Sequence, residues 1–172
     1  MRHPFLFTCI ALLITSICAY GQDTTQLKRT PYKLIVAVDK NTTYEEEIRG
    51  TAYVLPNKTI QLYPGETVYI ELKQVNGKIE SMTAVNEIKD STITITISFT
   101  QTVKKNVYEM TMLQVKNPFS RPLIYKAKIF LLTQKKWVDT DVYPVDAGLS
   151  AFETWPDIIT SIGLGGWTFK TN

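Results

Sequence analysis

The fold is decided by the stretch Val107-Tyr-Glu-Met-Thr-Met-Leu-Gln-Val115, Asn117-Pro-Phe-Ser-Arg-Pro122 and Leu123-Ile-Tyr-Lys-Ala-Lys-Ile-Phe-Leu131. In its last part Tyr125, Ala127, Ile129 and Leu131 share one face, whereas Lys126 and Lys128 share the other with Ile124 and Phe130. This period-two alternation is typical of a half-buried strand. The two prolines and the Asn-Pro step predict that the chain reverses between the two apolar runs. We therefore expect residues 107–131 to form a hairpin at the centre of a β-sandwich.

Short strands separated by turn residues are expected on both sides of this stretch. Thr67–Lys73 alternates with Val68, Ile70 and Leu72 on the inner face, and Asn76-Gly77 predicts a tight hairpin that leads into Lys78–Val85. Ser91–Phe99 is the most regular strand, with isoleucines and Phe99 on one face and Thr92, Thr94, Thr96 and Ser98 on the other. Because this strand lacks charge, we expect it to be paired on both sides or to use its threonine face as a contact surface.

Several segments carry more specific structural expectations. Tyr32–Val38 is nearly all apolar and predicts a strand covered on both faces, and the acidic segment Asp39–Glu47 predicts a solvated loop. Pro156 after Trp155 predicts the start of a short helix, and Gly165-Gly166 predicts a bulge in the final strand.

The overall pattern predicts an all-β protein, a single immunoglobulin-like antiparallel β-sandwich of about nine or ten short strands with one short helix near the C-terminus. We expect the domain to span residues 32–172 and to be preceded by a flexible entry over residues 22–31.

Residues 1–21 resemble a secretory signal peptide. Arg2 and His3 precede an apolar run, and Ala19-Tyr-Gly21 places small residues at the positions that a signal peptidase reads, which predicts cleavage after Gly21. The alternatives are a membrane anchor, for which the run is shorter than the roughly 20 residues that span a bilayer, and lipidation at Cys18. The bulky Ile17 before that cysteine makes lipidation the less favoured reading. We expect a secreted, periplasmic protein without a transmembrane span after cleavage.

Cleavage would also remove the histidine His3 and both cysteines, Cys9 and Cys18. Ser-His-Asp and Cys-His catalysis, disulfides and structural zinc sites would then be excluded, and no cofactor is expected. Without Arg2, one of the 19 basic residues is lost against 16 acidic ones, so the net charge would be +2. A charge so near balance argues against nucleic acid as a partner.

The C-terminal third resembles small secreted immunoglobulin-like β-sandwich proteins of Gram-negative bacteria. The residues that carry this resemblance are Leu113-Gln-Val-Lys-Asn-Pro-Phe119, Leu123-Ile-Tyr-Lys-Ala127, Tyr143-Pro-Val-Asp-Ala-Gly148 and Phe152-Glu-Thr-Trp-Pro156. The likeness implies a fold and a compartment but no catalytic residue. The paired cysteines that bracket the core tryptophan of true immunoglobulin domains are missing.

Aromatic and acidic residues gather in the same third of the sequence. Tryptophan and tyrosine rings stack on the apolar faces of sugars, and carboxylates accept hydrogen bonds from hydroxyls. The candidate ligand- or partner-binding residues are Trp155, Glu153, Asp157, Trp137 and Tyr143. The competing interpretation is that the tryptophans, including Trp167, belong to the core. We predict no metal site and no catalytic residue.

Two other chemistries for these acids are weaker. Asp139, Asp141 and Asp146 could ligate calcium, but the spacing lacks the glycine and the distal glutamate of a calcium loop. A glycosidase pair that includes Glu153 would need two carboxylates at a defined separation, which the sequence does not set.

The expected function is a non-catalytic binding or assembly module. It would capture an envelope protein through an exposed strand edge or through the C-terminal aromatic loops. The alternative is a carbohydrate-binding module that uses Trp155 and the neighbouring acids. The sequence leaves the oligomeric state open.

Overall fold

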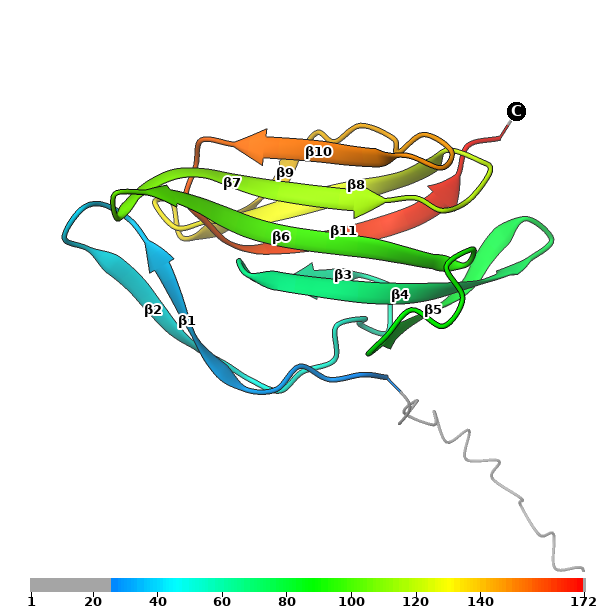
Figure 1. Cartoon of the computed structure of the whole chain (residues 1–172), viewed down its shortest axis with the longest axis horizontal. Helices are drawn as coiled ribbons and strands as arrows, with labels where there is room; N and C mark the ends of the chain where they lie inside the picture. The colour runs from blue at the N-terminus through cyan, green and yellow to red at the C-terminus, as the bar shows by residue number, and fades with distance from the viewer. Residues whose placement is uncertain (1–25, 172) are drawn as a thin grey trace, which may run out of the picture.

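The computed structural model describes residues 26–171, so the expected leader lies outside the described residues. The protein is all-β, with antiparallel sheets of five and four strands in a sandwich-like arrangement and a separate two-stranded sheet beside them (Figure 1). The strands are β1 (Tyr32–Ala37), β2 (Thr43–Ile48), β3 (Ile60–Leu62), β4 (Glu66–Val75), β5 (Lys78–Val85), β6 (Thr94–Lys104), β7 (Val107–Lys116), β8 (Leu123–Leu131), β9 (Lys136–Thr140), β10 (Ser150–Trp155) and β11 (Ile159–Phe169).

The order of the five-stranded sheet is β10-β7-β6-β4-β5, and that of the four-stranded sheet is β3-β11-β8-β9. The main core lies between these two sheets and is built by alternating inward residues, as expected for face-to-face packing. Its fully buried members include Ile70, Ile95, Ile97, Phe99, Leu113, Leu123, Ile162 and Leu164. The predicted inward faces of Thr67–Lys73 and of Leu123–Leu131 are confirmed.

Several predicted turns and pairings are also confirmed. Asn76 and Gly77 both have positive φ, as a type I′ hairpin between β4 and β5 requires. β6 is paired with β4 on one side and β7 on the other, which satisfies the main-chain groups of the charge-free segment. The register of β11 against β8 shifts after Gly165, where the bulge was expected.

The predicted hairpin over residues 107–131 is wrong. β7 belongs to the five-stranded sheet and β8 to the four-stranded sheet, so the connection between them crosses the sandwich. The buried Asn117 holds this crossing, because its Nδ2 donates to the carbonyls of Arg121 and Val145 at 2.9 Å each. The tight turn next to β7 lies instead at Lys105-Asn106, where both residues have positive φ and join β7 to β6.

The predicted C-terminal helix is also wrong. Only Pro156, Asp157 and Ile158 separate β10 from β11, which is too few residues to establish a helix. The carbonyl of Ile158 accepts a hydrogen bond from the backbone of Leu132, and the carbonyl of Asp157 accepts one from the Tyr108 hydroxyl. The part of the chain that the structure describes contains no helix, and therefore none that is long and apolar enough to cross a membrane.

The acidic segment is a loop only over residues 39–42, because Thr43–Ile48 forms β2 and pairs with β1. We call these two strands the arm. β1 is covered on one face only: Leu34 and Val36 are buried with Ile48, whereas Ile35 is exposed. Apolar character on both faces of β1 therefore did not predict burial on both faces.

The end of the arm is fixed to β6 by one side chain. The Gln101 amide accepts a hydrogen bond from Ala37 N at 3.0 Å and donates one to Ala37 O at 2.8 Å, as a neighbouring strand would.

Residues 26–31 of the expected flexible entry are anchored to the domain. Arg29 is 3% exposed, its Nε donates to Glu66 Oε1 at 2.9 Å, and its guanidinium lies over the rings of Tyr53 and Tyr63. A buried arginine needs such partners, because an unpaired buried charge is costly.

Candidate functional site

Trp155 lies where β10, an edge strand of the five-stranded sheet, meets β9, an edge strand of the four-stranded sheet. It is half-buried against the core, and its Nε1 donates to Thr140 Oγ1 at 3.0 Å, which links β10 of one sheet to β9 of the other. The ring thus closes this side of the sandwich. This placement explains Trp155 as a structural residue.

Glu153 and Tyr143 contact each other near this junction of β9 and β10, which we call the seam. Glu153 Oε1 accepts a hydrogen bond from the backbone N–H of Tyr143 at 2.8 Å, so the carboxylate orders the segment between β9 and β10. The Tyr143 side chain is 78% exposed. Asp157 is exposed on the β10–β11 connection. Four of the five predicted site residues therefore lie at or beside the seam and its loops.

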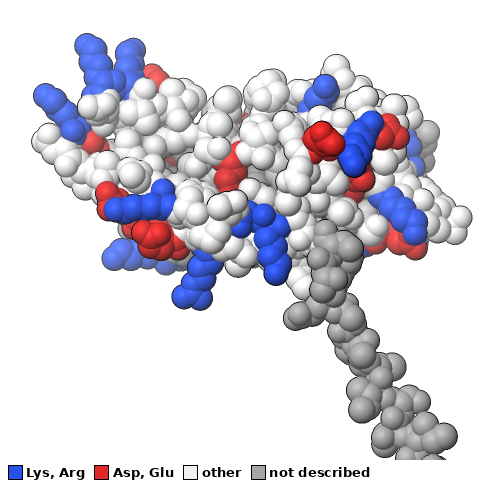
Figure 2. Space-filling model, turned by 60° about the horizontal axis from the view of Figure 1, so that its bottom comes forward, with Lys and Arg blue, Asp and Glu red and all other residues white. Residues whose placement is uncertain are grey.

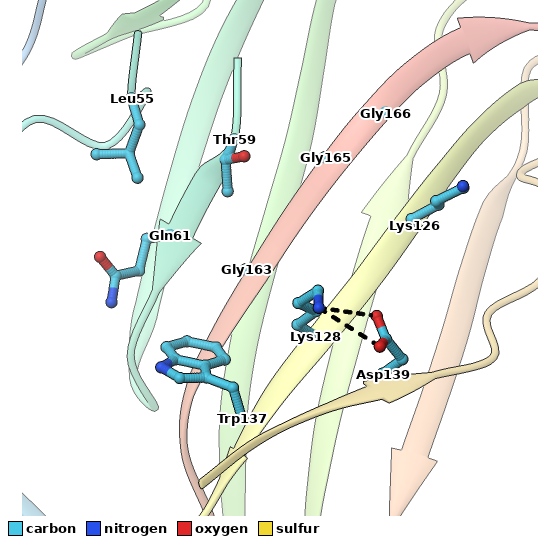
Figure 3. A pocket seen from close by; sticks show the side chains of 10 residues that line it. All are labelled: Leu55, Thr59, Gln61, Lys126, Lys128, Trp137, Asp139, Gly163, Gly165 and Gly166. Atoms are coloured by element: carbon cyan, nitrogen blue, oxygen red, sulfur yellow. Dashed lines mark hydrogen bonds and ion pairs between the residues drawn. The ribbon is translucent and has the colours of Figure 1, made fainter. Parts of the chain in front are cut away.

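The fifth, Trp137, lies in a groove on the outer face of the four-stranded sheet, and none of the other four lines that groove (Figure 3). The groove has a volume of about 390 Å³, within the range of small-ligand sites. We call it the outer groove. Its lining residues are Leu55, Thr59, Gln61, Lys126, Lys128, Trp137, Asp139, Gly163, Gly165 and Gly166.

The floor of the outer groove is the glycine-rich half of β11. Ile162 and Leu164 point into the core, so the alternating residues Gly163 and Gly165 lie on the outer face. Figure 3 shows the glycines along the middle of the groove, with Thr59 and Gln61 on the β3 side and the lysines on the β8 side. Since these glycines have no side chains, the backbone of β11 is open to a ligand.

The register of the sheet places four lining residues in one row across the strands. Gln61 of β3 is opposite Gly163 of β11, Gly163 is opposite Lys128 of β8, and Lys128 is opposite Asp139 of β9. The Gln61 side chain is fixed, because its Nε2 donates to the hydroxyls of Tyr63 and Ser161 at 3.2 and 3.1 Å. One amide, an ammonium group and a carboxylate are thus held around the glycine floor.

Trp137 forms an aromatic wall of the outer groove. It is 44% exposed, and its ring packs edge-on against Phe130 of β8 with the centroids 5.6 Å apart. The ring reaches across β8 towards β11, because its Cζ3 would lie 3.8 Å from a Cβ built on Gly163. Trp167, in contrast, is a core residue that stacks on Tyr125.

Gly163 is not required by the backbone. Its φ is not in the left-handed region, and an added Cβ would make only ordinary contacts, at 3.7 Å to Thr59 Cγ2 and 3.8 Å to Trp137 Cζ3. A glycine inside a strand weakens it and often marks a place where a ligand or another backbone approaches closely. Gly163 therefore points to a ligand more directly than any other residue of the groove.

The charged groups of the outer groove are two lysines and one aspartate. Lys128 Nζ pairs with Asp139 at 3.2 and 3.4 Å from the two carboxylate oxygens. On the face of the protein shown in Figure 2, basic and acidic side chains are interspersed at both ends. Neither end of that face therefore carries charge of one sign only.

The calcium alternative gains no support. Asp139 is ion-paired with Lys128, and no group of three His, Cys, Asp or Glu side chains that could hold a metal occurs within residues 26–171.

Sequence reasoning identified Trp137 but missed the residues around it. The available signal was the alternation of Gly163 and Gly165 on one face of an otherwise apolar strand, together with Lys126 and Lys128 on one face of the strand that pairs with it.

The described chain is thus an all-β protein with antiparallel sheets and an open groove on one of them. No protein-family model, no curated protein and no solved structure matched the chain.

Proposed function

We propose that this protein is a non-catalytic carbohydrate-binding module whose ligand lies in the outer groove. The observation that carries the proposal is the exposed Trp137 ring beside Gly163, a strand glycine that the backbone does not require. The proposal keeps the glycan-binding alternative of the sequence analysis but moves the aromatic platform from Trp155 to Trp137.

A sugar ring has apolar C–H faces and a polar rim, and the groove offers a partner for each. The Trp137 ring suits the apolar face, while Gln61, Thr59 and the Lys128–Asp139 pair offer donors and acceptors to the hydroxyls. The glycine floor lets the sugar approach the backbone of β11.

The absence of catalysis is part of the proposal. Among the ten residues that line the groove in the described chain, Asp139 is the only carboxylate, whereas most glycosidases use a pair. Glu153, the other candidate for a catalytic carboxylate, accepts a hydrogen bond from the backbone N–H of Tyr143 and lies at the seam, outside the groove lining.

We further propose that the protein is secreted into the periplasm and has an immunoglobulin-like topology. The leader-like sequence of residues 1–21 supports secretion. Two facing antiparallel sheets, between which the chain crosses at the β3–β4, β7–β8, β9–β10 and β10–β11 connections, support the topology.

A second candidate function is capture of an envelope protein at the edge strand β10. This strand ends the five-stranded sheet, and Leu149 and Phe152 are each 58% exposed on or beside it. A partner strand could add to such an edge.

The test is a glycan array probed with the secreted form of the protein, followed by calorimetric titration of the sugars that bind. Trp137→Ala should weaken binding about tenfold or more, because stacking and apolar burial are lost. Trp155→Phe keeps a ring in the seam and should leave the affinity unchanged. Equal binding by folded Trp137→Ala, or loss of binding only in Trp155→Phe, would overturn the groove as the site.

A further inference from the structure

We infer that the glycan bound in the outer groove is acidic, with a carboxylate that lies beside Lys126. The inference rests on the proposed function and names the class of sugar that the same site takes.

The two lysines of the groove are not equivalent. Lys128 is paired with Asp139, so its charge is largely compensated within the sheet. Lys126 forms no ion pair with any residue of the described chain. The lining therefore has one uncompensated positive charge, and Lys126 is the residue that holds it.

The stem of Lys126 is placed along the groove floor. Its Cγ and Cδ would lie 3.6 and 3.7 Å from a Cβ built on Gly166, and Lys126 is opposite Gly165 in the register of β8 and β11. Lysine side chains commonly pack their stem on a surface and leave the ammonium group in water. The ammonium group is thus available at the rim, next to the open backbone of β11.

The position of Lys126 relative to Trp137 gives the expected binding mode. The Trp137 ring of β9 reaches the row of Gly163 and Lys128, and Lys126 lies two residues before Lys128 on β8. Two residues of a strand span about 7 Å. A chain of a few sugar units can therefore stack one ring on Trp137 and place the carboxylate of another ring at Lys126.

The experiment compares oligogalacturonides with the same oligosaccharides after methyl esterification, titrated against the full secreted protein at low and high salt. Esterification removes the charge and keeps the sugar backbone, so the two probes are matched. We expect the acidic form to bind about fivefold tighter at low salt, the size of one exposed charge pair in water. Added salt should reduce the difference. Sulfated oligosaccharides form a second arm that distinguishes carboxylate from general anion recognition.

Lys126→Gln should abolish the preference for the acidic form, whereas substitution of the exposed lysine Lys116 on the other sheet, Lys116→Gln, should leave the preference as it is. Asp139→Asn should increase the preference, because it releases Lys128. A preference that survives Lys126→Gln, or tight binding of sulfated but not carboxylated sugars, would overturn the inference.

The inference and the proposed function fail in different ways. If neutral glycans bind through Trp137 and acidic ones bind no better, the inference is wrong and the proposed function stands. If no glycan binds in a manner that depends on Trp137, both are wrong.

Discussion

Gly163 and Gly166 lie on the same strand, yet they lack a side chain for different reasons. Gly166 has φ +64°, a left-handed conformation that costs about 1–2 kcal/mol for other residues. Gly163 has no such conformation and has space for a methyl group. The fold therefore explains Gly166, whereas Gly163 is explained only by the proposed binding of a ligand.

These two glycines give a matched prediction of stability. Gly163→Ala should raise the free energy of unfolding by about 0.5–1 kcal/mol, because alanine loses less conformational entropy on folding. Gly166→Ala should lower it by about 1–2 kcal/mol. Urea unfolding followed by circular dichroism measures both. Equal destabilisation by the two substitutions would mean that the fold, and not a ligand, requires Gly163.

Residue types could be predicted from the sequence better than their roles. Trp155 was preferred to Trp137 as the candidate, although both are tryptophans near acidic residues in one third of the chain. What separates them is the neighbouring strand: Trp155 meets Thr140 across the seam, whereas Trp137 lies over Phe130 on an open face. That information depends on sheet order, which a single sequence does not contain.

At the scale of elements, the arm is stabilised by tyrosines that resist ionisation. Burial raises the pKa of Tyr32, and the negative charge of Glu66 adds to this effect. Burial, followed by its hydrogen bond to Glu46, raises the pKa of Tyr44 to about 12. Burial also raises the pKa of Tyr63. All three pack against Leu34, Val36 and Ile48 of the small core.

This arrangement predicts loss of stability at alkaline pH. Above pH 10 the tyrosines of the unfolded chain release protons, while those of the folded arm retain them up to about pH 12 or higher, so unfolding becomes more favourable as the pH rises. The contribution is fully present below pH 10. Tyrosinate absorbance and circular dichroism should show a cooperative alkaline transition.

Tyr32→Phe should move the midpoint of this transition to higher pH, whereas Tyr143→Phe, which changes an exposed tyrosine outside the arm, should leave it in place. A midpoint that does not respond to Tyr32→Phe would contradict the role given to the arm.

Local signals predicted elements well, and long-range pairing was predicted poorly. The bounds of Lys78–Val85 matched β5, because Asn76-Gly77 fixes the turn and alternation fixes the strand. The three glutamates 45–47 suggested a loop, but pairing with β1 and the salt bridge from Lys33 to Glu45 accommodate them in β2. The helix expected after Pro156 fails because the two flanking strands leave it no room.

At the scale of the whole molecule, composition and periodicity predicted an all-β protein but not which strands share a sheet. Adjacent segments such as β7 and β8 pack across the core, and the groove depends on strands from distant parts of the sequence, β3, β8, β9 and β11. A flat outer face would result if β11 carried side chains at Gly163 and Gly165. The open groove is thus a product of both topology and two small residues.

A two-dimensional ¹H–¹⁵N NMR titration of the protein with a glycan selected on the array tests whether the outer groove is the binding site. We predict that the backbone amides of Gly163, Gly165 and Gly166 and the indole N–H of Trp137 shift together, while the indole signals of Trp155 and Trp167 stay in place. Shifts confined to β10 and Trp155 would contradict the groove as the binding site.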